Sequence, residues 1–263
     1  MSHAIDNLDL AVTYALLIVP GGVLLWLRPR LLPRLGVAVL RMSVQLLLVG
    51  LYLHVLFEAD RWWLSGAWLG VMLLVADGSV LAGSGLTWRR HGPAVFAALV
   101  VGTAVPLAVL LLTLGSTTAA LLIPLAGMIL GNGLRAQVVG LRTFHTGLTD
   151  RRAEYELLLT QGATRREAIA PFLSDAIESS LAPTLATVAT VGLVSLPGMM
   201  TGVLLGGGDP SSAVRYQIAI MLAILAATAA SVPLAIVLAL PRTLDPAGLR
   251  AVSRCSTSDQ QST

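Results

Sequence analysis

The sequence predicts an all-α polytopic membrane protein with about seven transmembrane helices. The first observation is composition: 56% of the 263 residues are hydrophobic, 12% are charged, and the mean hydropathy is +0.81. A soluble core cannot bury so much apolar surface. The second observation is that the apolar residues gather in segments of about 20 residues, the length at which a helix crosses a bilayer.

Seven segments are long enough to span a membrane. They lie near Leu10–Leu27, Leu35–Phe57, Trp63–Leu86, Pro93–Leu114, Thr118–Leu141, Ser179–Leu205 and Val214–Leu240. Fifteen of the 17 basic residues, all of them arginines, follow the odd-numbered segments and so share one side. By the positive-inside rule we expect the N-terminus outside and the C-terminus in the cytoplasm.

We expect a single transmembrane domain over residues 1–250 and a disordered polar tail at 251–263. The lone Cys255 lies in that tail, so an internal disulfide framework is excluded. The start of the chain lacks a basic n-region, and no cleavable signal peptide is expected. Arginines at membrane edges indicate lipid rather than nucleic acid as the surroundings.

The sixth segment contains the run VGLVSLPGMMTG at 191–202, which is unusual for a helix that faces lipid. Pro197 predicts a kink, because proline lacks an N–H and disturbs the preceding turn. Gly198, Gly202 and Gly206 recur every four residues, a pattern of close helix packing. Met199 and Met200 either fill a packed core or line a transport pathway.

Polar residues inside other spans are further candidates for a pathway. Gln45 lies one turn beyond Arg41 on the same face of the second span. Asp77, in the third span, is either a functional ionisable group or part of a helix break at Asp77-Gly78-Ser79. Asn132 is either a packing residue or a substrate contact, beside a second small-residue pattern formed by Gly127 and Gly131.

The longest cytoplasmic connection, about 142–175, predicts two short helices joined by a glycine turn. Asp150 is placed at the N-cap of the first helix and Gly162 at its C-cap. Thr164 and Glu167 form a capping box for the second helix, which is expected to break near Pro171. The surface expected to dock a partner or lie on the membrane contains Tyr155, Glu156, Leu158, Leu159, Gly162 and Arg165.

Several runs together resemble one family of ABC-transporter permeases. They are LRMSVQLLLVG at 40–50, IPLAGMILGN at 123–132, ELLLTQGATRREAI at 156–169 and VGLVSLPGMMTG followed by DPSSAVRYQI at 191–218. The chain is similar over about residues 35–240 to the FetB-type iron-export permeases, which have plant relatives linked to aluminium tolerance. Two departures concern the substrate: the glycine- and serine-rich stretch at 77–85, and Arg135 where small or polar residues are usual.

This resemblance implies a permease subunit in the bacterial inner membrane that exports metal ions, iron in the bacterial cases. It implies a separate cytoplasmic ABC ATPase, which binds ATP and Mg²⁺, and two copies of each subunit. The chain itself has no Gly-x-x-x-x-Gly-Lys-Ser/Thr phosphate loop, and we expect it to bind no cofactor. The residues name no metal site, and the four histidines are expected at loops or interfaces.

Two other functions stay open. A carrier driven by an ion gradient would use Asp77 as its ion site and would need no ATPase. An intramembrane aspartyl protease would pair Asp77 with Asp209 of the Gly-Gly-Gly-Asp run at 206–209, although Asp209 precedes Pro210 in what reads as an ordinary external turn.

Overall fold

The structure is a computed structural model, and it describes residues 7–59, 61–115, 118–194, 197–245 and 248–249. The described part is almost entirely helical, which confirms the all-α class. Two strands of two residues each, β1 (Leu244–Asp245) and β2 (Gly248–Leu249), pair antiparallel after the last helix. The predicted tail at 251–263 lies outside the described residues.

The chain forms two compact units, Met1–Ala59 and Asp60–Thr263. The helices of the first unit are α1 (Asn7–Tyr14), η1 (Ala15–Leu17), α2 (Ile18–Leu27), η2 (Pro29–Leu31) and α3 (Leu32–Ala59). This unit is a helical hairpin that reverses at Arg28–Leu31, and α2 packs against α3. The hydroxyls of Tyr14 and Ser43 share a hydrogen bond between its two arms.

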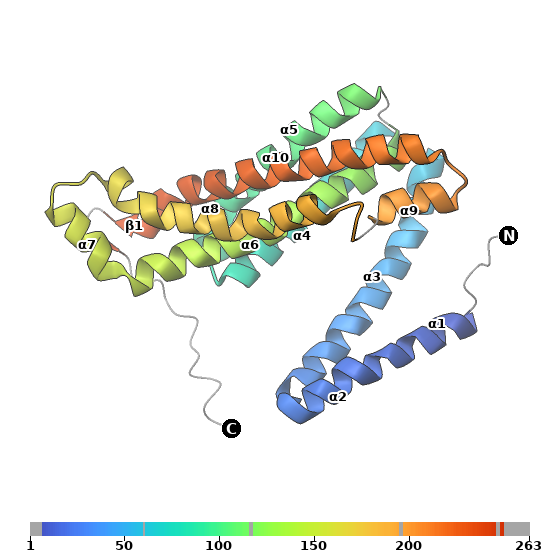
Figure 1. The fold of residues 1–263 in the computed structure, drawn as a ribbon, viewed down its shortest axis with the longest axis horizontal. Coiled ribbons are helices and arrows are strands. Elements are labelled where there is room, and N and C mark those ends of the chain that lie inside the picture. Colours follow the sequence, from blue (N-terminus) through green and yellow to red (C-terminus); the bar gives the residue numbers. More distant parts are fainter. Residues whose placement is uncertain (1–6, 60, 116–117, 195–196, 246–247, 250–263) are drawn as a thin grey trace. The chain divides into compact units, whose positions relative to one another are not determined.

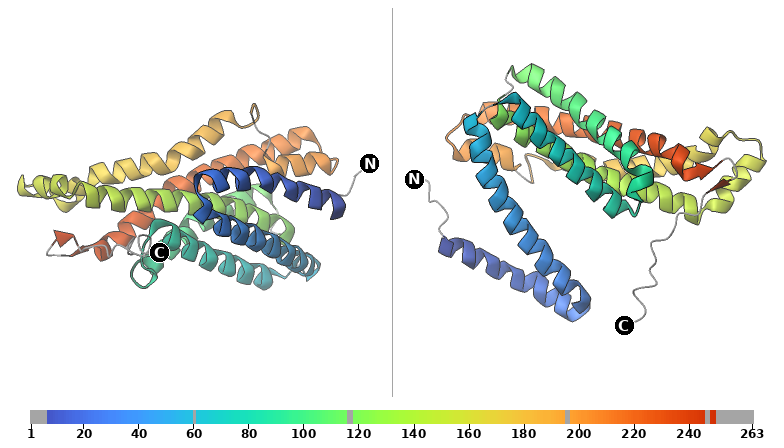
Figure 2. Two further views of the ribbon diagram at one scale, coloured as in Figure 1. Left: turned by 90° about the horizontal axis from the view of Figure 1, so that it is seen from below. Right: turned by 180° about the vertical axis from the view of Figure 1, so that it is seen from behind.

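The second unit is a bundle that positions the candidate site. Its helices are α4 (Trp62–Ser84), α5 (Trp88–Leu114), α6 (Ala119–Asp150), α7 (Arg152–Thr160), α8 (Arg165–Thr190), α9 (Gly198–Leu205) and α10 (Pro210–Thr243). Helix α6 packs against α4, α5, α8 and α10, and α10 packs against α5, α6, α8 and α9. Figure 1 shows α6, α8 and α10 running along one another, with α7 at the end of the bundle. The two views in Figure 2 show the same arrangement.

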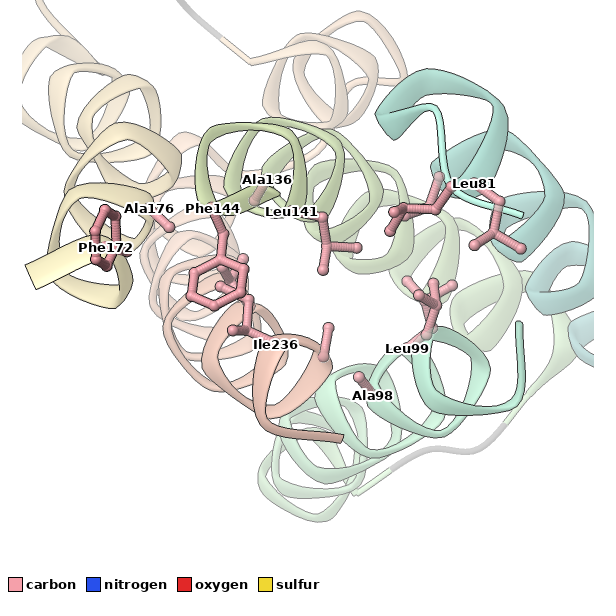
Figure 3. Packing of buried hydrophobic residues seen from close by; sticks show 14 of the residues in the cluster. Leu81, Ala98, Leu99, Ala136, Leu141, Phe144, Phe172, Ala176 and Ile236 are labelled. Atoms are coloured by element: carbon pink, nitrogen blue, oxygen red, sulfur yellow. The ribbon is translucent and has the colours of Figure 1, made fainter. Parts of the chain in front are cut away.

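The core of this unit has two clusters of buried apolar side chains, and one of them extends to the end nearest α7. Phe144 of α6, Phe172 of α8 and Ile236 of α10 are each about 1% exposed and belong to one cluster. Figure 3 shows these side chains with Ala176 between the helices. Small residues at Ala136 and Ala176 let the three helices approach at this level.

Five helices of the described chain are long and apolar enough to cross a membrane: Pro29–His54, Trp62–Ser84, Trp88–Leu114, Ala119–Asp150 and Pro210–Pro241. They match five of the seven predicted spans and confirm a multi-pass membrane protein. The first predicted span corresponds to a shorter apolar helix, Val12–Leu27. The count of seven and the placement of the termini stay predictions.

The predicted sixth span, Ser179–Leu205, is wrong as one kinked helix. Helix α8 ends at Thr190, and α9 begins only at Gly198. Gly192 adopts a left-handed φ of +88° inside the break, a conformation that ends a helix. Pro197 is therefore the N-cap residue of α9 and not a kink within a helix.

The other prolines behave differently, because neighbouring helices support the chain around them. Pro171 and Pro183 both lie inside the continuous helix α8, so the predicted break near Pro171 is wrong. Pro106 is buried within α5, and Pro124 lies within α6. Packing against neighbours satisfies the backbone groups that a proline frees in a membrane helix.

Within one chain, the closest helix packing uses other glycines than those predicted. Among the described residues, a Cβ added at Gly131, Gly198 or Gly202 would meet no atom within 4 Å, while one at Gly127 would lie 3.3 Å from the Met72 side chain. At Gly206 the near atoms belong to the preceding turn. A Cβ at Gly102 would instead lie 2.5 Å from Ser231 Cβ, and one at Gly140 only 2.4 Å from Val232 Cγ1. These two glycines allow α10 to approach α5 and α6.

Candidate functional site

The most developed site in the second unit is a cavity of about 380 Å³ between α6, α8 and α10. Its apolar wall includes Met128 and Ala136 of α6 and Ile220 and Met221 of α10, and Pro197 closes one side. Six polar side chains line it: Asn132, Arg135, Ser180, Thr184, Thr187 and Gln217. A concave apolar site with a few polar groups is the usual form of a small-ligand site.

Helix α6 supplies its part of the wall from one face. Met128, Asn132, Arg135 and Val139 follow a spacing of four, three and four residues, which keeps them on one side of a helix. The Asn132 Nδ2 donates to the Met128 carbonyl oxygen at 2.8 Å, so this amide nitrogen is satisfied within α6. Arg135 is exposed and forms no ion pair with any residue that the structure describes.

Helix α8 supplies a stripe of hydroxyls by the same spacing. The Ser180 Oγ donates to the Ile177 carbonyl oxygen at 2.9 Å, and the Thr187 Oγ1 donates to the Pro183 carbonyl oxygen at 2.9 Å. These bonds use the hydroxyl hydrogens and leave oxygen lone pairs free. The stripe therefore faces the cavity mainly as acceptors.

Like Ser180, Gln217 of α10 is a buried polar residue of the wall. Its side chain is 7% exposed, and its Oε1 has no hydrogen-bond partner among the described residues. An unpaired buried amide oxygen costs about 1–3 kcal/mol. A bound molecule or water that donates to Gln217 would remove this cost.

Of the residues predicted to form a pathway, only Asn132 and Pro197 line this cavity. Met199 packs against the apolar cluster of α5, α6 and α10 instead. Met200 is half-buried, and Gly198 is exposed at the start of α9. Whether these residues line a pathway in another conformation stays a prediction.

Gln45 lies in the first unit, so it is described apart from the cavity. It lines a shallow hollow on α3 together with Arg41, Arg34 and Met42. The shared face of Arg41 and Gln45 agrees with the spacing in the sequence.

Asp77 belongs to a second buried polar group, formed by α4, α5 and α6. Its side chain is 2% exposed, its Oδ1 has no partner among the described residues, and its Oδ2 lies near Gly92 and Trp88 at the start of α5. Asp77 lies inside the continuous helix α4, about two turns before its end, so the proposed helix break at 77–79 is wrong.

His91 and His145 meet in the same part of the bundle. Their ring centroids are 5.7 Å apart at an angle of 77°, and both residues are buried. The expectation that the histidines lie at loops or interfaces is therefore wrong for this pair. Among the described residues, no group of three or more His, Cys, Asp or Glu side chains is arranged to hold a metal ion.

The predicted helix–glycine–helix element is present, as α7, a turn at Gly162 and α8. Gly162 has a φ of +91°, which places it in the left-handed region after the end of α7. Asp150 is the last residue of α6 rather than an N-cap, because Arg151 takes that position. Helix α6 thus runs directly into the element without a flexible linker.

The capping box is confirmed in full. The Glu167 backbone N–H donates to the Thr164 Oγ1 at 3.4 Å, while the Thr164 backbone N–H donates to the Glu167 Oε2 at 2.7 Å. The Thr164 hydroxyl also donates to the same carboxylate oxygen at 2.7 Å. These hydrogen bonds from Thr164 lower the pKa of Glu167 below its usual range.

A side-chain network joins the element to the core. The Arg151 guanidinium pairs with the Asp175 carboxylate of α8 and stacks 4.6 Å from the centroid of the Phe172 ring. On the outer face, the Arg152 Nε donates to the Glu156 Oε1 at 2.6 Å. The predicted docking residue Glu156 is thus exposed and oriented by its neighbour.

The apolar part of the predicted docking surface needs correction. Tyr155 is buried, and Leu158 and Leu159 are partly buried against the core cluster. They face inward because α7 folds back on α8, which the sequence of α7 alone does not show. Leu157, 56% exposed, is the apolar side chain that α7 presents outward. Gly162 and Arg165 remain exposed at the turn.

Asp209 lies in an exposed turn just before α10, as expected from Pro210. The Ser212 backbone N–H donates to its Oδ2 at 2.9 Å, and this bond lowers the pKa of Asp209. A protease dyad needs one carboxyl group that holds a proton at neutral pH. Asp209 instead favours its charged form, so the geometry gives the protease no support.

Sequence reasoning did not identify Ser180, Thr184, Thr187 or Gln217. A signal for the first three was available, because their spacing of four and three residues marks one helix face. Gln217 stood inside the recognised run DPSSAVRYQI, but no pattern showed that it would be buried. Arg135 was noted only as an unusual residue.

Comparison with protein families and known proteins gives consistent results. Residues 7–244 match the model of an uncharacterised protein family, UPF0014. The UPF0014 membrane protein YjkA of Bacillus subtilis is 35% identical over 210 residues, covering 78% of this chain and 82% of YjkA. No solved structure matches the chain.

Two further relatives have names that refer to metals. The Escherichia coli protein named Probable iron export permease protein FetB is 32% identical over 235 residues, covering 88% of this chain and 89% of FetB. The Arabidopsis thaliana Protein ALUMINUM SENSITIVE 3 is 32% identical over 188 residues, covering 70% of this chain and 67% of that protein. Both similarities agree with the resemblance found in the sequence.

Proposed function

Because the chain belongs to the UPF0014 family of membrane proteins, we propose that it is the permease subunit of an ABC transporter that exports metal ions, iron first among them. ATP is bound and hydrolysed with Mg²⁺ on a separate cytoplasmic ATPase. The name of the relative FetB supports iron and the outward direction. The transporter is a homodimer of this permease in the bacterial inner membrane, with one ATPase on each copy.

The observation that carries this proposal is the rigid element formed by α7, Gly162 and the start of α8. It is fixed at three points: the continuous chain from α6, the capping box at Thr164, and the contact of Arg151 with Phe172. A force applied to its outer face would pass to the bundle without being lost in a flexible loop. This is the property that an ATPase docking element requires.

Helix α8 connects this element with the cavity. Its first half packs on the core through Phe172, and its second half carries Thr184 and Thr187 on the cavity wall. A shift of α7 would therefore change the position of a wall that lines the cargo site. The break after Thr190 separates that end of α8 from α9 and lets it move.

The test is the capture of an ATPase by the intact permease. The tagged protein, extracted gently from its own membranes, is expected to bring down a stoichiometric ABC ATPase with a Gly-x-x-x-x-Gly-Lys-Ser/Thr motif. Leu157→Asp is expected to abolish capture, because it places a charge at the exposed apolar residue of α7. Leu158→Asp is unsuitable, since Leu158 packs against the core and the variant would unfold.

Ser174→Asp is the matched control, since it adds the same charge at an exposed position of α8 outside α7. It should retain the ATPase. Equal capture by wild type and Leu157→Asp would show that α7 is not the docking surface. Absence of any ATPase from the wild-type preparation would remove the proposal itself.

One observation favours a second candidate function, a carrier driven by an ion gradient. The buried Asp77 carboxylate has an oxygen without a partner among the described residues, as the ion site of a gradient-driven carrier would. In that case Asp77→Asn would abolish transport, and Leu157→Asp would leave it unchanged. The permease proposal predicts the reverse order of effects.

A further inference from the structure

The charge of the cavity between α6, α8 and α10 limits what it can bind. Arg135 is the only charged side chain among the described residues that line it, and no carboxylate faces it. A bare or hydrated divalent cation would meet a positive charge with no compensating negative group. Like charges in a partly enclosed site repel more strongly than in water. The wall therefore disfavours a free metal cation.

Arg135 lies close to one edge of the membrane-spanning part of α6. It lies 16 residues after the start of α6, about 24 Å along the helix at about 1.5 Å per residue. The hydrocarbon layer of a bilayer is about 30 Å thick. Arg135 is therefore about 6 Å inside one edge of that layer, where an arginine side chain can reach the interface. Because it has no ion pair among the described residues, its charge is available to a negatively charged cargo at this end of the cavity.

The remaining polar groups specify a second property of the cargo. Gln217 Oε1 is buried without a partner among the described residues, and the hydroxyl hydrogens of Ser180 and Thr187 are used within α8. These groups, on α8 and α10, present oxygen acceptors to the same cavity as Arg135. They fit a molecule with its own O–H donors, such as alcohol groups or metal-bound water.

From these observations the geometry points to a cargo that enters the cavity as an anion: a metal ion held by a carboxylate- and hydroxyl-bearing chelator, in a complex of net negative charge. Arg135 binds the carboxylate side of the complex, and Gln217 accepts from its hydroxyl or water side. This inference rests on the proposed metal transport and specifies the chemical form of the metal.

The experiment measures binding to the full chain in nanodiscs of phosphatidylcholine, so that no anionic lipid competes for Arg135. The probes are iron(III) citrate, iron(II) kept reduced without citrate, and metal-free citrate, each radiolabelled. Wild type is expected to bind iron(III) citrate saturably and more tightly than either other probe. Loss of a charge-assisted contact in Arg135→Gln should weaken this binding by about ten-fold or more.

Arg142→Gln is the matched control. It removes an exposed arginine two turns further along α6, outside the cavity wall, and should change the affinity by less than about two-fold. Gln217→Leu should weaken binding by a smaller factor than Arg135→Gln. Size-exclusion profiles of the three variants show whether each is folded before its affinity is compared.

Two other binding results would refute an anionic metal complex as the cargo. If iron(II) without citrate binds as tightly as the complex, and Arg135→Gln leaves that binding unchanged, the anionic cargo is refuted while metal export stands. If metal-free citrate binds best, the metal complex is refuted. Binding is measured without an ATPase, so the expected result would hold for the cavity even if no ATPase were captured from membranes.

Discussion

The two halves of α8 differ sharply although they belong to one helix. In the first half Ala168, Ile169, Phe172 and Ala176 are buried against α6 and α10. In the second half Ser180 is buried near the middle of the helix, but from Leu181 to Thr190 no residue is buried, and the helix ends in a break. The first half is fixed by packing, while the second half is held mainly by its own backbone. One element thus combines a rigid attachment with an end that is free to shift.

The largest expected effect is a loss of stability when the packed first half of α8 is disrupted. Phe172→Ala removes a ring that is about 1% exposed and that also stacks with Arg151, and should cost about 3–5 kcal/mol of stability. Leu185→Ala, on the free half at 51% exposure, should change stability by less than about 0.5 kcal/mol. Thermal unfolding in detergent measures both, and equal losses would contradict the division of α8.

The second prediction concerns Gly140, where α6 meets α10 and the middle of α8. In Gly140→Ala the new Cβ would lie 2.4 Å from Val232 Cγ1, so the helices must separate at a cost of about 1–3 kcal/mol. The new Cβ of Gly131→Ala, on the same helix, meets no atom of the described residues within 4 Å, so this variant should be neutral or stabilising. Comparing the melting temperatures of the two variants tests the assignment, which fails if Gly131→Ala is the more harmful.

The third prediction concerns Gly162, in the turn just before the packed first half of α8. Gly162 has a φ of +91°, where an alanine costs about 1–2 kcal/mol, so Gly162→Ala should loosen the turn. Gly198→Ala, at a helical position with open space around it, should be tolerated. Hydrogen exchange should show faster opening of α7 amides in Gly162→Ala alone. Unchanged exchange there would mean that the turn does not hold α7 in place.

The smallest expected effect is a pH dependence at the start of α8. Because Thr164 lowers the folded-state pKa of Glu167, the capping box contributes fully above the ordinary glutamate pKa. The contribution is lost as pH falls through the lowered folded-state value. The protection factors of the Glu167 and Ala168 amides, which correct for the intrinsic slowing of exchange at lower pH, should therefore fall on acidification. Glu167→Gln should remove most of this dependence, and an identical profile in the variant would contradict it.

The features that the sequence predicted well depend on neighbouring residues. The Thr164–Glu167 capping box and the Gly162 turn are each determined by four or five consecutive residues. Five of the spans follow from length and hydropathy alone. These features can be predicted without knowing which other helices pack against them.

The features that were missed depend on contacts between distant segments. Tyr155 is buried because α7 folds back on α8, and His91 meets His145 only through the packing of α5 on α6. Prolines were equally ambiguous: Pro183 stays inside α8, whereas the helix ends before Pro197, where Gly192 is left-handed. The rule that proline disturbs a helix does not predict whether a helix will continue through a proline or end before it, because that depends on the packing of neighbouring helices.

The length of α6 has a consequence for the membranes in which the protein can work. Its 32 residues extend about 48 Å, against a hydrocarbon layer of about 30 Å. About 18 Å of helix therefore lies beyond that layer, and α7 is attached at that far end. Bilayers that differ in thickness by a few Å can be accommodated along this overhang. Hydrophobic mismatch would then change how deeply α6 is immersed without altering the geometry by which α7 is joined to α8.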